Sequence, residues 1–208
     1  MPRPARFSDT QILDATATLV AGGGPGAATI GAIGAVLDAP SGSIYHRFPS
    51  RDVLLGRLWL SKAAFFQGRF VAALRDPDPW NAGREAALSL PRSVRADFAG
   101  ARIMLLHRRD DFLSAGWPAD LSDEAVRLRQ QVDEAINDIT RRLFGRVAPK
   151  TLRLTTFAIL DVPFAAVHRH VANGTTPPGY VDGLIDQAYS TLVRRRTPRA
   201  PGRRSMAQ

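Results

Sequence analysis

The sequence predicts an all-α protein of about nine helices, with a three-helix N-terminal domain followed by a larger helical body. Apolar residues recur three or four positions apart from one end to the other, which is the spacing of one helix face. Alternating apolar and polar residues, the pattern of a half-buried strand, are scarce, and no internal repeat appears. Glycine and proline clusters divide the apolar pattern into helix-sized segments.

The first helix has a clear beginning and end. Ser8 and Gln11 have the spacing of a capping box, and Phe7 and Ile12 that of a hydrophobic staple. The glycine-rich run 22–26, interrupted by a proline, ends the helix.

Two short helices follow, separated by a tight turn. Thr29 caps the second helix, and the turn 38–40 ends in a proline that suits a helix start. The third helix is expected over 41–47, with Ile44 and Phe48 pointing inward. Glycines inside the second helix, at Gly31 and Gly34, should weaken it by roughly 1 kcal/mol each relative to alanine.

The remaining segments predict six longer helices. We expect the fourth over 51–74, the fifth over 80–97 with a kink at Pro91, and the sixth over 99–108. After a loop over 109–121, Ser122 should cap the seventh helix and Gly145 should close it.

The last two helices complete the body. The eighth should run from Pro149 to His170 and bend near Pro163. The ninth carries one apolar face, formed by Val181, Leu184, Ile185, Ala188 and Leu192.

Composition limits the function classes. Without cysteine, the chain has no disulfide, thiolate nucleophile or cysteine-based metal site, which fits a cytoplasmic protein. The apolar run 152–167 is interrupted by Asp161 and Pro163, so we expect no membrane span and no membrane partner.

The net charge of +9 suggests an acidic partner, but its distribution weakens that inference. Six arginines lie between Arg194 and Arg204, and without them the net charge is +3. The first 57 residues have a balance of only +1. Residues 197–208 are therefore expected to form a basic, disordered tail, which is either a solvated terminus or an extra attraction for phosphates.

The sequence contains no recognisable catalytic, cofactor-binding or metal-binding motif. The glycines at 22 and 24 follow a helix rather than a strand, so they do not indicate a dinucleotide site, and we expect no cofactor. His107 near Asp110 and Asp111, and the pair His168 and His170, fit charged helix ends better than metal ligands, so we expect no metal. The chain is not expected to be an enzyme.

Three short helices with a tight turn between the second and third match a helix-turn-helix plan. Apolar residues of the trio would be buried, and the third helix would present its opposite side to the major groove of DNA. That side carries small, hydroxyl and donor groups: Ser41, Gly42, Ser43, Tyr45, His46 and Arg47.

The stretch from Ala28 to Leu55 resembles the signature of the TetR (tetracycline-repressor-like) family of bacterial transcriptional regulators, and the resemblance covers about residues 8 to 60. Its most diagnostic parts are Gly-Ser-Ile-Tyr-His-Arg-Phe over 42–48 and Ser-Arg-Asp-Val-Leu over 50–54. The resemblance implies a DNA-binding domain over 1–50 and a ligand-binding and dimerisation domain over 51–196. It departs from the family's pattern at Asp38, where glycine is common, and at Gly31 and Ser41, where a basic residue is common.

By position, the resemblance implies roles for individual residues. Thr29 would bind a phosphate, Ser41 and Ser43 would face bases or backbone, and Tyr45, His46 and Arg51 would clamp phosphates. Fewer basic contacts would make specificity depend more on hydroxyls and DNA shape.

The resemblance also implies a homodimer joined through the last two helices, which binds a palindromic operator and is released by an unknown small-molecule effector. Such a regulator is more often a repressor than an activator. Candidate pocket residues, each of which could instead be ordinary core, are Phe65, Phe66, Met104, His107, Trp117, Phe157, Asp161, Phe164 and His168. The alternative function is an architectural, nonspecific DNA binder that uses the Arg194–Arg204 tail.

Overall fold

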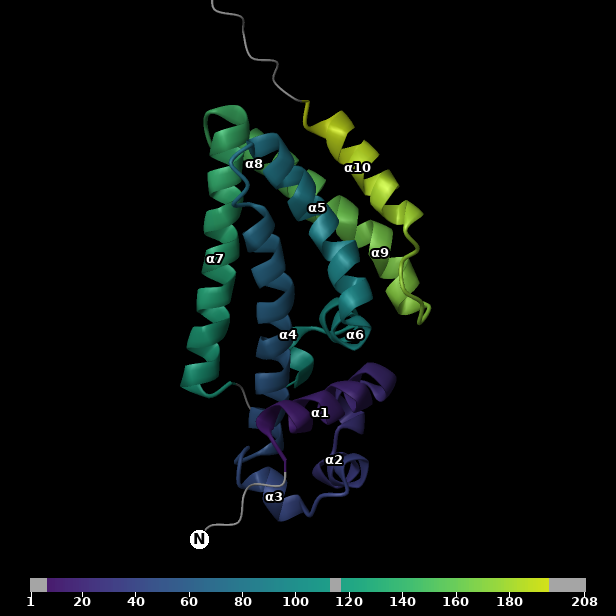
Figure 1. Cartoon of the computed structure of the whole chain (residues 1–208). Helices are drawn as coiled ribbons and strands as arrows, with labels where there is room; N and C mark the ends of the chain where they lie inside the picture. The colour runs from purple at the N-terminus through teal and green to yellow at the C-terminus, as the bar shows by residue number, and fades with distance from the viewer. Residues whose placement is uncertain (1–6, 113–116, 195–208) are drawn as a thin grey trace, which may run out of the picture.

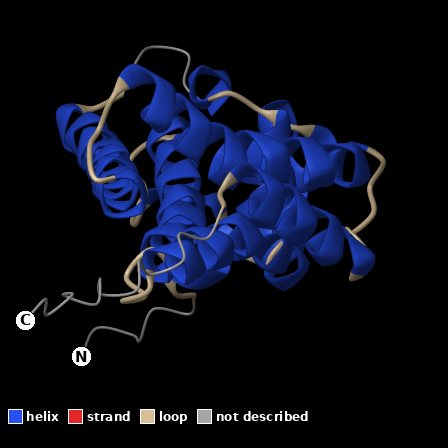
Figure 2. Ribbon diagram, turned by 90° about the horizontal axis from the view of Figure 1, so that it is seen from above, coloured by secondary structure: helices blue, strands red, loops and turns tan. Residues whose placement is uncertain are grey.

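The computed structural model describes residues 7–112 and 117–194, and every regular element in those ranges is helical (Figure 2). The α-helices are α1 Asp9–Gly23, α2 Ile30–Leu37, α3 Ser41–Tyr45, α4 Arg51–Ala73, α5 Pro79–Ala96, α6 Phe98–Leu106, α7 Ala119–Phe144, α8 Pro149–Thr156, α9 Val162–Ala172 and α10 Tyr180–Leu192. Short helical turns lie at Pro25–Ala27, Arg109–Phe112 and Phe157–Asp161. The all-α prediction is confirmed, and the basic tail 197–208 lies outside the described residues.

A head of three short helices lies at one end of the molecule, and the body lies above it (Figure 1). The long helix α4 leaves the head and continues through the body, where it packs against α5 and α7. Helix α6 lies at the base of the body and contacts both α1 and α9. Helices α4 and α6 therefore connect the two parts.

Local signals set the ends of the first helices as expected. The Ser8 hydroxyl accepts a hydrogen bond from the Gln11 amide at 3.2 Å, and the Gln11 side chain accepts one from the Ser8 amide at 2.8 Å. Both halves of the capping box are thus formed, and Gly24 ends the helix with a φ of 74°.

Helix α7 begins at Ala119, so the prediction of Ser122 as its cap is wrong. Leu121 is fully buried beside Leu60 and Ala125, which keeps the extra turn helical. The Ser122 hydroxyl donates to the Trp117 carbonyl at 3.4 Å instead of capping the helix.

The predicted eighth helix is present as α8 and α9, joined by a π-helical turn at Phe157–Asp161. Pro163 has no N–H to offer the carbonyl four residues before it, and the Val162 amide donates five residues back, to Phe157. The predicted bend near Pro163 thus coincides with this wider turn.

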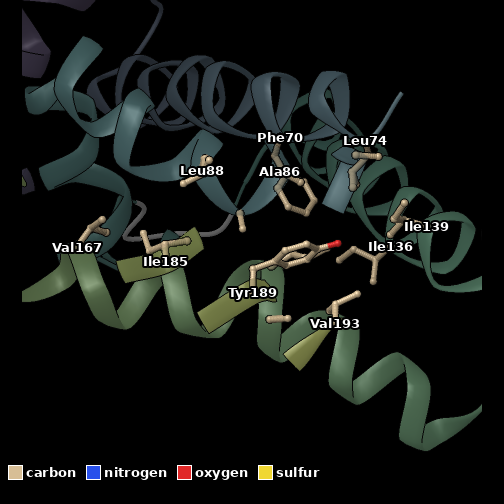
Figure 3. Close-up of a cluster of buried hydrophobic side chains, with 14 of the residues drawn as sticks. Phe70, Leu74, Ala86, Leu88, Ile136, Ile139, Val167, Ile185, Tyr189 and Val193 are labelled. Carbon is tan, nitrogen blue, oxygen red and sulfur yellow. The ribbon is translucent and has the colours of Figure 1, made fainter. Parts of the chain in front are cut away.

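Tyr189 of α10 lies at the centre of the body core and is fully buried (Figure 3). Its hydroxyl donates to the Trp80 carbonyl at 3.0 Å, and its ring packs against the Trp80 ring, with centroids 5.6 Å apart. Burial raises the pKa of Tyr189 above its ordinary value, and the negative charge of Asp78 adds to the effect.

Ion pairs attach α10 to α5. Arg84 donates to both carboxylate oxygens of Asp186, at 2.6 and 3.2 Å, and this hydrogen bonding raises the pKa of Arg84. Arg95 holds Asp182 in the same bidentate manner, at 3.0 and 2.7 Å. These two forks, of which the one at Arg84 is partly buried and the one at Arg95 is exposed, keep one side of α10 against the body.

The apolar face expected on the last helix is divided between two directions. Val181 and Ile185 are buried together with Tyr189, which the predicted face omitted. Leu184 points away from the body and is 57% exposed. Helix α10 therefore has an inner apolar side and a separate outer one.

Within 7–112 and 117–194, none of the helices combines the length and apolarity that crossing a bilayer requires.

Candidate nucleic-acid interface

The head has its own apolar core, which holds α3 in place. Ile44 of α3 and Ile33 of α2 are fully buried, and Phe48 closes the core beyond the end of α3. Elements outside the three short helices complete this core, with Leu54, Leu55 and Leu58 from α4 and Ile103 and Phe112 from the base of the body.

The turn between α2 and α3 depends on an unusual backbone conformation and on one backbone hydrogen bond. Asp38 ends α2 in the left-handed conformation, with φ 49° and ψ 48°. This is the position at which the family that the sequence resembles often has glycine, and aspartate is among the few residues that tolerate a left-handed conformation. The Ala39 amide then donates to the Gly34 carbonyl at 2.9 Å, which turns the chain toward α3.

The structure explains why position 34 is a glycine, which the sequence alone did not suggest. A Cβ at this position would stand 2.8 Å from the Ala39 carbonyl oxygen, whereas a Cβ on Gly31 would meet nothing within 4 Å. Gly34 is expected to weaken α2, but the turn brings two backbone segments so close together that only a residue without a side chain fits there.

The outer side of α3 is open to solvent. Ser41, Gly42 and His46 are exposed, Ser43 is half-buried, and Tyr45 is 50% exposed although Ile44 beside it is fully buried. A Cβ on Gly42 would meet nothing within 4 Å, so a groove wall could approach the backbone there. Five of the eight predicted contact residues thus lie on one free surface.

Thr29 lies at the N-terminus of α2 and is exposed. Its hydroxyl accepts a hydrogen bond from the Ala32 amide at 3.1 Å, which confirms it as the cap. The adjoining amides form the positive end of the helix, where a phosphate is favoured.

Arg47 and Arg51 have partners within the head. Arg47 forms an ion pair with Asp9 at the start of α1. Arg51 donates from Nε to the Ala28 carbonyl at 2.8 Å and from Nη2 to the Pro25 carbonyl. Arg47 thus holds the start of α1, and Arg51 holds the connection between α1 and α2. Spacing along the sequence could not have revealed these distant partners.

A third arginine is also engaged. Arg57 of α4 donates to Asp120 at 2.6 Å and to Glu124 at 2.9 Å, both on α7. Between residues 7 and 57, all the arginines therefore have oxygen partners in the protein, and the segment has no lysine. The free surface of α3 offers hydroxyl, phenol and imidazole groups instead of guanidinium groups.

The nine candidate pocket residues lie in separate places. Phe65 and Phe66 adjoin each other on α4, with ring centroids 5.2 Å apart. Met104 packs against the head core, and the His107 ring lies edge-on to Phe112 at 6.2 Å. Trp117 meets Trp59 edge-on at 5.6 Å.

The other four lie on the outward side of the bent helix α8–α9. Phe157 is 44% exposed, Asp161 is exposed, and Phe164 lies over His168 with ring centroids 5.2 Å apart. The structure does not bring the nine residues together, and their grouping as one pocket stays a prediction.

Metal-ligating side chains do not cluster in the described ranges, where no set of three or more histidine, aspartate or glutamate side chains could hold an ion. Asp111, one of the acids near His107, instead accepts from the Arg108 amide at 2.7 Å.

Comparison with known proteins identifies the head. Residues 12–58 match the family model described as bacterial regulatory proteins, tetR family. The matched segment contains most of α1, all of α2 and α3, and the start of α4. No curated protein matches the chain.

Solved structures share the whole fold at low identity. The fatty acid degradation regulator FadR of Bacillus halodurans is 14% identical, with a TM-score of 0.66, over 91% of this chain and 100% of its own. FadR of Bacillus subtilis, in complex with stearoyl-CoA, is 16% identical, with a TM-score of 0.68, over 90% and 98%. The TetR-family regulator PfmR of Thermus thermophilus is 17% identical, with a TM-score of 0.69, over 92% and 98%.

The head is thus a helix-turn-helix domain that matches the TetR family of bacterial regulatory proteins over residues 12–58, and the whole chain shares its fold with solved TetR-family regulators.

Proposed function

We propose that the protein is a homodimeric repressor that binds a palindromic operator and is released by a small-molecule effector. The observation that carries the proposal is the free outer surface of α3, held outward by the buried Ile44 and Phe48. A helix presented in this way fits the major groove, and a two-fold dimer would present two such helices to two half-sites.

Base and phosphate contacts would come from uncharged groups. Ser41, Ser43 and Tyr45 can donate to phosphates or base edges, and the amides behind Thr29 can bind a phosphate. Because Arg47 and Arg51 are engaged inside the head, they position this surface and add less to the attraction for DNA. Binding should therefore show a shallow dependence on salt.

The proposed dimer surface is the outer apolar side of α8, α9 and α10. A groove of about 440 Å³ lies there, lined by Phe157, Val162, Leu184, Gln187, Ala188, Thr191 and Leu192. Phe164 and Tyr180 are also exposed large apolar side chains on these helices. Pairing α8–α9 and α10 with their copies would bury these side chains in a four-helix arrangement.

The effector would bind in the body and change the separation of the two heads. The adjoining rings of Phe65 and Phe66 on α4 would supply apolar contacts for it. Since FadR of Bacillus subtilis binds stearoyl-CoA, long-chain acyl-CoAs are the first compounds to test as effectors.

The test begins with selection of binding sites from a random duplex library, followed by footprinting. We expect a discrete palindromic footprint, which the double substitution Tyr45→Ala and His46→Ala should abolish without unfolding the protein. Uniform protection with a steep salt dependence would instead favour the architectural binder. Survival of operator affinity in the folded double variant would overturn the role of α3.

A further inference from the structure

We propose that Arg102 is a positioning residue that fixes the distance between the two heads of the dimer, and hence the spacing of the operator half-sites that the protein accepts. Arg102 lies on α6, at the base of the body, and is partly buried. Its guanidinium joins the last turn of α1, in the head, to the last turn of α9, on the proposed dimer side. The inference therefore rests on the proposed dimeric function.

Two hydrogen bonds define this connection. Arg102 donates from Nε to the Ala21 carbonyl at 2.6 Å and from Nη1 to the Val171 carbonyl at 3.2 Å. Gly174, just after α9, also lies beside it, since a Cβ there would stand 3.8 Å from Nη1. One rigid planar group thus connects α6 with the ends of two helices that belong to different parts of the molecule.

The Ala21 carbonyl has a particular need for this donor. A helical carbonyl accepts from the amide four residues later, and that residue is Pro25, which has no N–H. The Gly24 amide donates to Val20 instead, at 2.8 Å. Without Arg102, the end of α1 would present an unpaired carbonyl to the base of the body.

The Val171 carbonyl has a similar setting at the end of α9. The Thr175 amide, four residues later, donates to His170 at 2.9 Å, and Val171 accepts from the Gly174 amide at 3.1 Å. Arg102 adds a second, charged donor at this C-terminal end, where the helix dipole favours a cation. The same guanidinium therefore stabilises two helix ends at once.

This arrangement determines the angle of the head. Helix α4 and the apolar contacts of Ile103 and Phe112 join the head to the body, and apolar contacts of this kind are non-directional, so they hold the angle of the head less strictly than hydrogen bonds do. The Arg102 hydrogen bonds connect the head to α9 at a second place, so rotation of the head must break them. Because α9 lies beside the proposed dimer surface, the bonds relate each recognition helix to the two-fold axis of the dimer.

A direct test measures the distance between the two heads without DNA. The chain has no cysteine, so the exposed Thr18 of α1 can be replaced in Thr18→Cys and carry one nitroxide label per protomer. Pulsed electron–electron double resonance on the labelled dimer should give a narrow distribution of distances between the two labels. We expect Arg102→Met to broaden or shift this distance distribution. Arg102→Lys keeps the charge without the planar fork and should give a distribution between those of the wild type and Arg102→Met.

The matched control is Arg142→Met. Arg142 also donates to backbone carbonyls, including that of Leu74 at 2.8 Å, but it lies at the far end of α7, away from the head. If Arg102 only stabilises the fold, Arg102→Met should behave like Arg142→Met. It should then lower the unfolding midpoint and leave the distance between the heads unchanged. Sedimentation of each variant establishes that it is still a dimer.

The second measurement selects operators with each variant. The wild type should accept one spacing between half-sites, whereas Arg102→Met should accept spacings that differ by one or two base pairs, with the half-site sequence unchanged. Affinity for the wild-type operator should fall about 5- to 150-fold. An unchanged distance distribution and an unchanged spacing in a dimeric Arg102→Met variant would overturn the inference. Absence of a dimer or of paired half-sites in the wild type would instead refute the proposed function.

Discussion

The carbonyl oxygen of Ala39 occupies the space beside Gly34, 2.8 Å from where a Cβ on that glycine would lie. The turn of the DNA-binding head closes at this point, because the Ala39 amide donates back to the Gly34 carbonyl. Backbone meets backbone there, so a larger residue could be accommodated only by moving α3 relative to α2.

The first prediction compares the two glycines of α2. Gly34→Ala should lower the free energy of unfolding by about 1–3 kcal/mol, because the added methyl group forces the turn apart. Gly31→Ala should raise it by about 0.5–1 kcal/mol, since the site is open and alanine favours the helix. Urea denaturation followed by circular dichroism measures both. If both variants were stabilised, the close approach at Gly34 would have no energetic importance.

The second prediction concerns the ion pair between Asp9 and Arg47. Asp9→Asn should release Arg47 toward the DNA, strengthen operator binding about 3- to 10-fold, and increase the salt slope by about 1. Fluorescence anisotropy over a series of salt concentrations measures both quantities. The control is Asp14→Asn, which removes the same charge from another position of α1. Equal gains from the two variants would show that only the net charge matters.

The third prediction is a pH dependence that arises from Tyr189. Burial raises its pKa in the folded protein above the ordinary value of 10.0, so the folded state keeps a proton that the unfolded state releases at higher pH. Stability should therefore be unaffected by this group below pH 10 and fall above it, by about 1.4 kcal/mol per pH unit.

Tyr189→Phe isolates this effect. At neutral pH the variant should be less stable by about 1 kcal/mol, because the hydrogen bond to the Trp80 carbonyl is lost. Above pH 10 the free energy of unfolding of the variant should decline less than that of the wild type, so the two plots of this free energy against pH should converge. Ile185→Val, in the same core, should cost about 1 kcal/mol at every pH and give a parallel curve. A parallel curve for Tyr189→Phe would contradict the prediction.

The fourth prediction tests the proposed dimer surface. Leu184→Glu places a charge in the exposed apolar groove and should weaken the dimer at least about 30-fold, because burying an unpaired carboxylate is costly. Val126→Glu is the control, since Val126 is 51% exposed on α7 and lies outside that groove. Sedimentation velocity gives the dissociation constants. A dimer that tolerates Leu184→Glu would have to be joined elsewhere.

Sequence reasoning succeeded where the determining interactions are local. The capping box of Ser8 and Gln11 and the cap at Thr29 involve residues three positions apart, and the structure contains both. The inward direction of Ile44 follows from helical spacing in the same way. The fold and the free surface of α3 could therefore be predicted from the sequence.

It failed where distant residues decide the outcome. Ser122 looked like a cap, but packing of Leu121 against Leu60 extends α7 by a turn. Arg47 looked free for DNA, but its partner Asp9 is 38 positions away. The sequence did contain a signal for the burial of Tyr189, which the prediction missed. Tyr189 continues the four-residue spacing of Val181 and Ile185 along α10.

The head core contains Ile103 and Phe112, which come from the base of the body and not from the helices that contact DNA. A chimera that joins residues 1–50 to the body of another regulator would leave the underside of that core facing unrelated side chains. Recombination between family members should succeed only where the recipient supplies an apolar pair at the same two places. Modular exchange of operator specificity therefore requires two segments to be transferred together, although the recognition helix itself is a single short stretch.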